Sequence, residues 1–239
     1  MEKYEKPDSY VSIDLETTGL NPKTDKIIEI GAIKVEKGKK TDSFSTFINP
    51  GRPLLDKIIE LTGICDEQLK DAPDIGEALP ELMDFLEDRV LLGHRILFDY
   101  SFIKKAAVNN RVKFERQGID TLKIARQYLP ELESRSLHFL CGYYQIPHRA
   151  HRALEDASAT CSLFERLWMD FGEGKEEKLF LPERLNYQAK REVPITAAQK
   201  ERLYKLIAKH KLSKEYNLDK LTRNEASRYT DRILSKYGR

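Results

Sequence analysis

The sequence predicts an α/β fold in which a mixed sheet is flanked by helices and followed by a small helical C-terminal appendage. Three observations indicate it. Strand-like apolar runs fill the first fifty residues, helical spacing of apolar residues begins near residue 75, and short strands then alternate with helices. Strands followed by alternating strands and helices are typical of a mixed sheet covered by helices.

Three strands are expected near the N-terminus, over Tyr10–Glu16, Lys26–Val35 and Asp42–Ile48. The turn signal Gly38-Lys39-Lys40 separates the last two. Strand-like runs separated by turns predict an antiparallel meander. The segment Asn49–Pro53, with two prolines and a glycine, ends it.

Helices and two short strands are expected after the meander. Helical spacing first places five apolar residues on one face: Ile75, Leu79, Leu82, Met83 and Leu86. Val90–Gly93 and Ile119–Asp120 are expected to be short strands, and a helix begins near Asp99. Further helices are expected over 121–128, 136–144 and 153–169.

Composition divides the chain into a body over residues 8–171, a linker over 172–192 and a small basic helical region over 193–239. The linker is expected because Phe171–Lys178 combines glycines with a run of charges. Thr196–Gln199 and Thr222–Glu225 are capping boxes, and Gly238 is placed to end the second helix. Two helices this short are expected to pack together, dock on the body or fold on a partner.

Charge is distributed unevenly along the 239 residues. Residues 173–239 hold 17 Lys and Arg against 10 Asp and Glu, a net charge of +7, which leaves −5 for residues 1–172. An acidic body with a basic tail favours a nucleic-acid partner. The alternative is a Lys-rich helix face that is merely solvated.

The N-terminus lacks the apolar core of a signal peptide, and no apolar run approaches the length that crosses a bilayer. The three cysteines, Cys65, Cys141 and Cys161, are widely spaced and odd in number, which indicates neither a disulfide framework nor a zinc motif. A cytoplasmic protein without membrane contact is expected.

Two carboxylates, Asp14 and Glu16, lie two residues apart in the first predicted strand. Positions i and i+2 of a strand point to the same face, so the two side chains should stand side by side. Like charges on a half-buried face repel each other unless a cation lies between them. A divalent metal site is therefore predicted; the alternative is a pair of solvated carboxylates on an edge strand.

Three more candidates lie near predicted helix starts: Asp99, His151 and Asp156. Each has an ordinary interpretation. Asp99 could be a helix N-cap, His151 a surface or capping histidine, and Asp156 an exposed acid favoured by the helix dipole. The tripeptide His148-Arg149-Ala150 is repeated at His151-Arg152-Ala153, so His148 is a second candidate histidine.

Together these segments resemble one family. Asp14–Gly19 (Asp-Leu-Glu-Thr-Thr-Gly), Gly93–Phe102 (Gly-His-x-x-x-Phe-Asp-x-x-Phe) and His151–Asp156 (His-x4-Asp) occur in the order of the DEDDh 3′–5′ exonucleases. This DnaQ-like group includes the proofreading epsilon subunit of bacterial DNA polymerase III. The resemblance spans about residues 8–170 and implies a ribonuclease H-like fold.

The resemblance implies a two-metal phosphodiesterase. Two divalent cations, Mg²⁺ or Mn²⁺, would be held by Asp14, Glu16, Asp99 and Asp156. His151 would be the general base, and the five-residue interval favours it over His148. The tyrosine branch of the family has Tyr at the position of Arg152, so the histidine branch is indicated.

The resemblance also implies a set of substrate-binding residues: Thr17, Thr18, Leu20, Leu61, Thr62, His94, Arg95 and Phe102. The alternative for several of them is a turn or core role. Arg95 departs from the family, which usually has Asn there. Its guanidinium could contact a phosphate or change the position of the substrate.

The expected function is hydrolysis from the 3′ end of single-stranded or frayed DNA, releasing nucleoside 5′-monophosphates, in proofreading, repair or end-trimming. A DNA polymerase or another replication or repair protein is the expected protein partner. Two alternatives stay open: an exoribonuclease resembling RNase T or oligoribonuclease, and a non-catalytic nucleic-acid-binding module on the same fold.

Overall fold

The computed structural model describes residues 5–148, 151–172, 177–212 and 217–238. Within these ranges one six-stranded sheet has the order β3-β2-β1-β4-β5-β6. Its strands are β1 (Tyr10–Thr17), β2 (Ile27–Glu36), β3 (Lys39–Phe47), β4 (Leu91–Gly93), β5 (Gln117–Asp120) and β6 (Glu183–Arg184). The first three are antiparallel, β4 and β5 run parallel to β1, and β6 is antiparallel to β5. The predicted meander and mixed sheet are confirmed.

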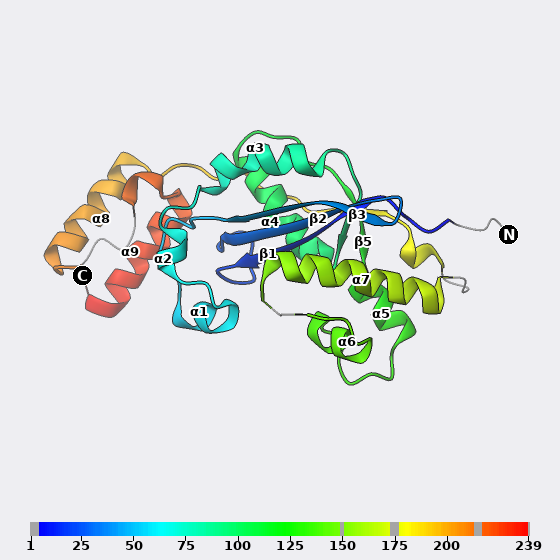
Figure 1. Ribbon diagram of the computed structural model, residues 1–239. Coiled ribbons are helices and arrows are strands. Elements are labelled where there is room, and N and C mark those ends of the chain that lie inside the picture. The colour runs from blue at the N-terminus through cyan, green and yellow to red at the C-terminus, as the bar shows by residue number, and fades with distance from the viewer. Residues whose placement is uncertain (1–4, 149–150, 173–176, 213–216, 239) are drawn as a thin grey trace.

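Helices cover both faces of this sheet. They are α1 (Asp56–Thr62), α2 (Asp66–Leu69), α3 (Ile75–Leu86), α4 (Ile96–Asn109), α5 (Thr121–Tyr128), α6 (Leu137–Tyr143), α7 (Ala153–Phe171), α8 (Ala197–Lys209) and α9 (Arg223–Tyr237), with 3-10 turns η1 (Glu177–Phe180) and η2 (Leu218–Lys220). In Figure 1, α3 and α4 lie on one side of the sheet, and α7 with α5 and α6 lies on the other. In the part of the chain described, no helix is both long and apolar enough to cross a membrane.

The alternation of β1 decides which residues face which helices. Val11, Ile13 and Leu15 are buried in the core that α3 and α4 complete. The intervening side chains point to the face of α7, where the Ser12 hydroxyl donates to the carbonyl of Ala157 at 2.8 Å. Asp14 and Glu16 belong to this second set, since side chains two residues apart share a face. The alternation therefore directs both carboxylates toward α7.

Part of the segment expected to be a linker packs on the body. Phe180 in η1 is fully buried and contacts the rings of Phe164 and Trp168 on α7. In β6, Glu183 pairs with Gly118 of β5, and Leu185 beyond it joins the main core. Residues 180–185 therefore pack on the body of the protein. The division of the chain at residues 171 and 192 stays a prediction.

The C-terminal region forms a helical hairpin with its own small core. This core contains Leu203, Ile207, Leu218, Leu221, Ala226, Tyr229 and Ile233. Both predicted capping boxes are present, because Thr196 accepts from the N–H of Gln199 and Thr222 from that of Glu225. Gly238 ends α9 at φ 82°. Figure 1 shows α8 and α9 beyond the end of the sheet at which β1 finishes.

Candidate active site

Four carboxylates converge where β1 ends. Oxygens of Asp14, Glu16 and Asp156 all lie within 4.8 Å of one another. Asp99 lies in the first turn of α4, and one of its oxygens accepts the backbone N–H of Leu15 at 3.1 Å. Because α4 begins at Ile96, Asp99 is not its N-cap. The structure thus brings together all four acids proposed from the sequence.

The negative charges of these acids repel one another. Burial is the main cause that raises the pKa of Asp14 well above its usual range, and the charges of Asp99, Asp156 and Glu16 add to it. Burial, followed by the charges of Asp156 and Glu29, raises the pKa of Glu16 to about 8. Burial and mutual repulsion make the ionised form of these carboxylates unfavourable. A bound cation would remove this repulsion, so the site is suited to one.

The donor set fits divalent cations. Hard ions such as Mg²⁺ and Mn²⁺ prefer carboxylate oxygens and retained water to nitrogen or sulfur. Asp14 and Glu16 are only partly buried, so water and a substrate can reach the ligand atoms. The group of acids that could hold a metal ion comprises Asp14, Glu16 and Asp156, with Asp99 beside it.

The start of α7 packs directly on β2 at Gly31, and this contact determines the position of Asp156. A Cβ added at Gly31 would lie 2.1 Å from the Leu154 nitrogen and 2.2 Å from the Ala153 carbonyl carbon. Only glycine allows the helix this close to the sheet. Since Gly31 is paired with Asp14, the helix is brought directly over the first carboxylate.

Glu29 fixes the same helix end electrostatically. The residue is 1% exposed, and its carboxylate accepts from the Arg152 guanidinium at 2.9 and 3.2 Å and from the N–H of Ala153 at 3.1 Å. An acidic group at a helix N-terminus satisfies a free N–H and interacts well with the helix dipole. Glu29 is the register partner of Glu16. One strand pair therefore positions Asp14, Glu16 and, through α7, Asp156.

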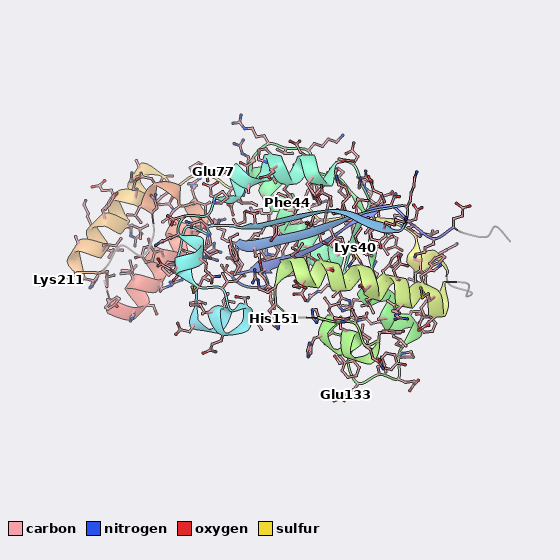
Figure 2. All side chains as sticks on the ribbon, viewed as in Figure 1. Lys40, Phe44, Glu77, Glu133, His151 and Lys211 are labelled. Atoms are coloured by element: carbon pink, nitrogen blue, oxygen red, sulfur yellow. The ribbon has the colours of Figure 1, made fainter. Side chains whose placement is uncertain are left out.

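The two candidate histidines are placed differently. Nε2 of His148 contacts a carboxylate oxygen of Asp156, and the His148 side chain is almost fully buried. His151 is exposed at φ 65°, and its backbone N–H donates to the other Asp156 oxygen at 3.0 Å. Figure 2 shows His151 at the N-terminal end of α7. The assignment of the general base to His151 stays a prediction.

Among the proposed substrate-binding residues after Glu16, the side chains differ in exposure. The hydroxyl of Thr17 is buried and donates to the carbonyl of Gly19 at 2.7 Å. Thr18 Oγ1 accepts from Arg52 at 2.6 Å and from the N–H of Lys26 at 3.0 Å. Leu20 is 78% exposed. The threonines therefore shape the loop, and Leu20 presents its apolar side chain to solvent.

The residues proposed on α1 show the same division. Leu61 is exposed, whereas Thr62 is buried and its hydroxyl donates to the carbonyl of Ile58 at 2.8 Å. Thr62 thus has a structural role within α1, and Leu61 offers an apolar surface.

Around α4, His94 is engaged within the protein. Its Nε2 donates to the carbonyl of Arg135 at 2.7 Å, and its Nδ1 lies 2.9 Å from Thr121 Oγ1. Arg95 is exposed at φ 78°, with its N–H donating to Asp120 at 3.0 Å. Phe102 is buried and packs on Phe98, with ring centroids 5.0 Å apart. Arg95 is therefore the member of this group with an exposed side chain, whose guanidinium carbon lies 5.8 Å from the centroid of the Phe98 ring.

Three residues were missed by sequence reasoning: Glu29, Gly31 and Arg52. A carboxylate and a glycine inside the apolar run Ile27–Val35 were the available signal, because neither residue type favours a buried strand interior without a reason. Arg52 lies in a turn segment that gave no comparable signal.

Four carboxylates gathered at the end of the central strand of a mixed sheet are an arrangement suited to an enzyme that binds divalent cations. The family model described as exonuclease (RNase_T) matches residues 11–164, more than half of the chain. The protein belongs to this exonuclease family, whose members hydrolyse phosphodiester bonds of nucleic acids.

Relatives and solved structures agree with this placement. The chain is 41% identical over 160 residues to the PolC-type DNA polymerase III of Caldanaerobacter subterraneus subsp. tengcongensis, covering 66% of this chain and 11% of that protein. It is 32% identical over 240 residues to the PolC-type DNA polymerase III of Bacillus subtilis (strain 168), covering 95% and 17%. The chain thus spans less than a fifth of the length of these curated relatives.

Two solved structures share the fold. The nuclease domain of 3′hExo, a DEDDh family member bound to rAMP, superposes with a TM-score of 0.59 at 22% identity, covering 70% of this chain and 95% of that one. Exonuclease X in complex with 5′ overhanging duplex DNA gives a TM-score of 0.57 at 23% identity, covering 72% and 99%. The predicted ribonuclease H-like fold is confirmed.

Proposed function

We propose that this chain is a divalent-metal-dependent 3′–5′ exonuclease that releases nucleoside 5′-monophosphates from single-stranded or frayed DNA. The observation that supports this proposal most directly is the cluster of Asp14, Glu16 and Asp156. Their oxygens lie within 4.8 Å of one another, and Asp99 lies beside them. Mg²⁺ or Mn²⁺ bound there would supply the charge stabilisation that phosphodiester hydrolysis requires.

The protein's own residues bind and orient the substrate, and one of them moves a proton. Leu20 and Leu61 present exposed apolar side chains to the terminal bases. Arg95 presents a guanidinium suited to a phosphate. His151 accepts the proton of the attacking water, since its imidazole is exposed and follows the family spacing.

A role beside a DNA polymerase is supported by the relatives, which are named PolC-type DNA polymerase III. Such an arrangement would let the site remove the 3′-terminal nucleotide of a growing strand. We propose proofreading as the biological setting, with a polymerase as partner.

RNA is the second candidate substrate. A structural neighbour is described as the 3′-end specific recognition of histone mRNA stem-loop by 3′-exonuclease, at 20% identity and a TM-score of 0.60. The same carboxylate cluster would serve either sugar, because the chemistry is at the phosphate.

The test is a cleavage assay on 5′-labelled single-stranded DNA and RNA of the same sequence, with Mg²⁺, Mn²⁺ or EDTA. An Asp14→Asn variant is the control. A ladder that shortens from the 3′ end, needs metal and is absent in the variant is expected, with DNA degraded faster. No cleavage of either substrate with both metals would contradict the proposal and leave a binding module as the alternative.

A further inference from the structure

A cleft of about 800 Å³ separates the C-terminal helices from the exonuclease body. One wall is α9 with the segment before it. The other consists of the loop between β1 and β2, the loop after β3, the start of α3 and one side of α4. The proposed mechanism uses no residue of α9. The cleft that α9 lines therefore has no role in that mechanism.

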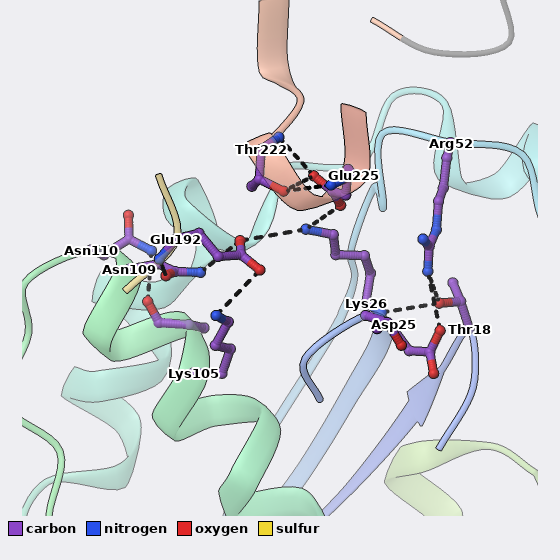
Figure 3. Close-up of polar contacts among 12 residues, drawn as sticks. Thr18, Asp25, Lys26, Arg52, Lys105, Asn109, Asn110, Glu192, Thr222 and Glu225 are labelled. Carbon is purple, nitrogen blue, oxygen red and sulfur yellow. Dashed lines mark hydrogen bonds and ion pairs between the residues drawn. The ribbon is translucent and has the colours of Figure 1, made fainter. Parts of the chain in front are cut away.

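Ion pairs hold the two walls together (Figure 3). Lys26, just before β2, lies 3.0 Å from Glu225 of α9. Lys105 of α4 lies 3.3 Å from Glu192, which also exchanges two hydrogen bonds with Asn109 at 3.0 and 3.1 Å. These side chains are mostly buried, so the hairpin is positioned by paired, partly desolvated charges.

The acidic groups that line the cleft already have partners in the protein. Glu225 and Glu192 pair with lysines, as above, and Asp25 lies 3.4 Å from Arg52. The other two acids cap the start of α3: Asp74 accepts from the N–H groups of Gly76 and Glu77, and Glu77 accepts the N–H of Asp74. Three of the five lining acids are therefore paired with a basic side chain, and the other two accept backbone N–H groups.

The lining bases include two arginines of α9. Arg228 and Arg232 are exposed and lie four residues apart, which places them on one face of the helix. Arg52 and Lys70 line the same cleft. The C-terminal region, residues 173–239, carries a net charge of +7. Exposed guanidinium groups along one wall of a cleft are complementary to a phosphate backbone.

The cleft shares two elements with the acidic cluster. Thr18, two residues after Glu16, accepts hydrogen bonds from Arg52 and from the N–H of Lys26, which both line the cleft. On α4, Phe102 lines the cleft one turn after Asp99. The cleft therefore adjoins the two elements that carry Glu16 and Asp99.

We propose that this cleft binds the sugar-phosphate backbone of the nucleic-acid strand on the 5′ side of the nucleotides being hydrolysed, with Arg228 and Arg232 as phosphate contacts. The inference rests on the proposed function. It makes the C-terminal hairpin a second binding site of the nuclease, which increases affinity for long strands and leaves hydrolysis of very short ones unchanged.

The test measures binding and hydrolysis separately on the full chain. Binding of labelled single-stranded DNA of about 20 and about 4 nucleotides is measured in EDTA over a range of salt concentrations. Hydrolysis of the short strand is measured with Mn²⁺. The cleft variant Arg228→Gln/Arg232→Gln is compared with the matched variant Arg202→Gln/Lys205→Gln, which removes the same charge from exposed positions on α8 that do not line the cleft.

The cleft variant is expected to bind the long strand about tenfold more weakly, and the slope of log K against log salt should fall by about 1.4, because two phosphates are no longer neutralised by arginine. The short strand should be bound and hydrolysed as by the parent, and Arg228→Lys/Arg232→Lys should retain most of the long-strand affinity.

Equal losses in the cleft and matched variants, or an unchanged affinity of the cleft variant, would overturn the proposal; unchanged affinity would favour a protein as the occupant. Failure of the parent to hydrolyse even the short strand would count against the proposed function alone, because the binding comparison does not depend on cleavage.

Discussion

Replacing Glu16 by Gln is expected to stabilise the metal-free protein while weakening its metal site. The pKa of Glu16 is raised to about 8, chiefly by burial and then by the charges of Asp156 and Glu29. Between its ordinary value of 4.5 and about 8, the folded protein retains a proton that the unfolded chain has released. The stability of the metal-free protein therefore falls as the pH rises through this window.

The size of the effect follows from the shift. At pH 7 the raised pKa corresponds to about 3 kcal/mol of lost stability, at about 1.4 kcal/mol for each pH unit above the ordinary pKa. Solvent reaches part of the Glu16 side chain and screens its neighbours. A gain of about 1–3 kcal/mol is therefore expected for Glu16→Gln at pH 7, and almost none at pH 4, where the carboxylate is largely protonated in both states.

Urea unfolding in EDTA at several pH values measures this gain. Glu155→Gln is the matched control, because Glu155 is exposed one residue before Asp156 and the substitution removes the same charge. Added Mg²⁺ or Mn²⁺ should stabilise the parent strongly and the Glu16→Gln variant weakly, since a ligand that binds only the folded state raises its stability.

Two results would refute this reasoning. One is a Glu16→Gln variant whose stability follows the pH dependence of the parent, which would mean that Glu16 is not held in a repulsive, desolvated position. The other is an equal gain in Glu155→Gln, which would assign the effect to net charge rather than to the cluster.

Three further predictions concern the positioning and use of the site. In urea unfolding, Gly31→Ala should destabilise the protein by about 1–3 kcal/mol, and it should lower metal affinity because it displaces α7. The control Gly142→Ala, with open space around the added Cβ, should be neutral or stabilising. His151→Ala should lower kcat by about 10²–10⁴ with little change in substrate affinity, and a similar loss confined to His148→Ala would move the general base to that residue. Arg95→Asn should reduce the salt dependence of short-strand binding by a slope of about 0.7, and an unchanged slope would exclude a phosphate contact.

The sequence was sufficient wherever a short-range rule applied. Asp14 and Glu16 were predicted on one face because side chains two residues apart on a strand always share it. Both capping boxes of the C-terminal hairpin were likewise predicted from spacing alone, and the structure forms them. Asp99 and Asp156 required the family resemblance, because a lone carboxylate near a helix start has an ordinary capping role.

Long-range contacts could not be predicted from spacing. Gly31 and Glu29 gain their roles from a helix more than 120 residues later in the chain, and periodicity carries no such information. The same is true of β6, a strand of two residues within a charged segment. The contact of His148 with Asp156 also depends on the path of the chain into α7 rather than on any motif.

The packing of Phe180 and Leu185 sets a lower limit on the smallest fragment that can fold as a nuclease. Every candidate catalytic residue lies before Asp170, yet a chain cut there would lose a fully buried aromatic residue that packs on α7 and the last strand of the sheet. Loss of a buried aromatic side chain costs about 3–5 kcal/mol, a large share of the stability of an ordinary domain. The helix that carries Asp156 is therefore held at its far end by residues outside the catalytic motifs, and a functional fragment must extend through Leu185.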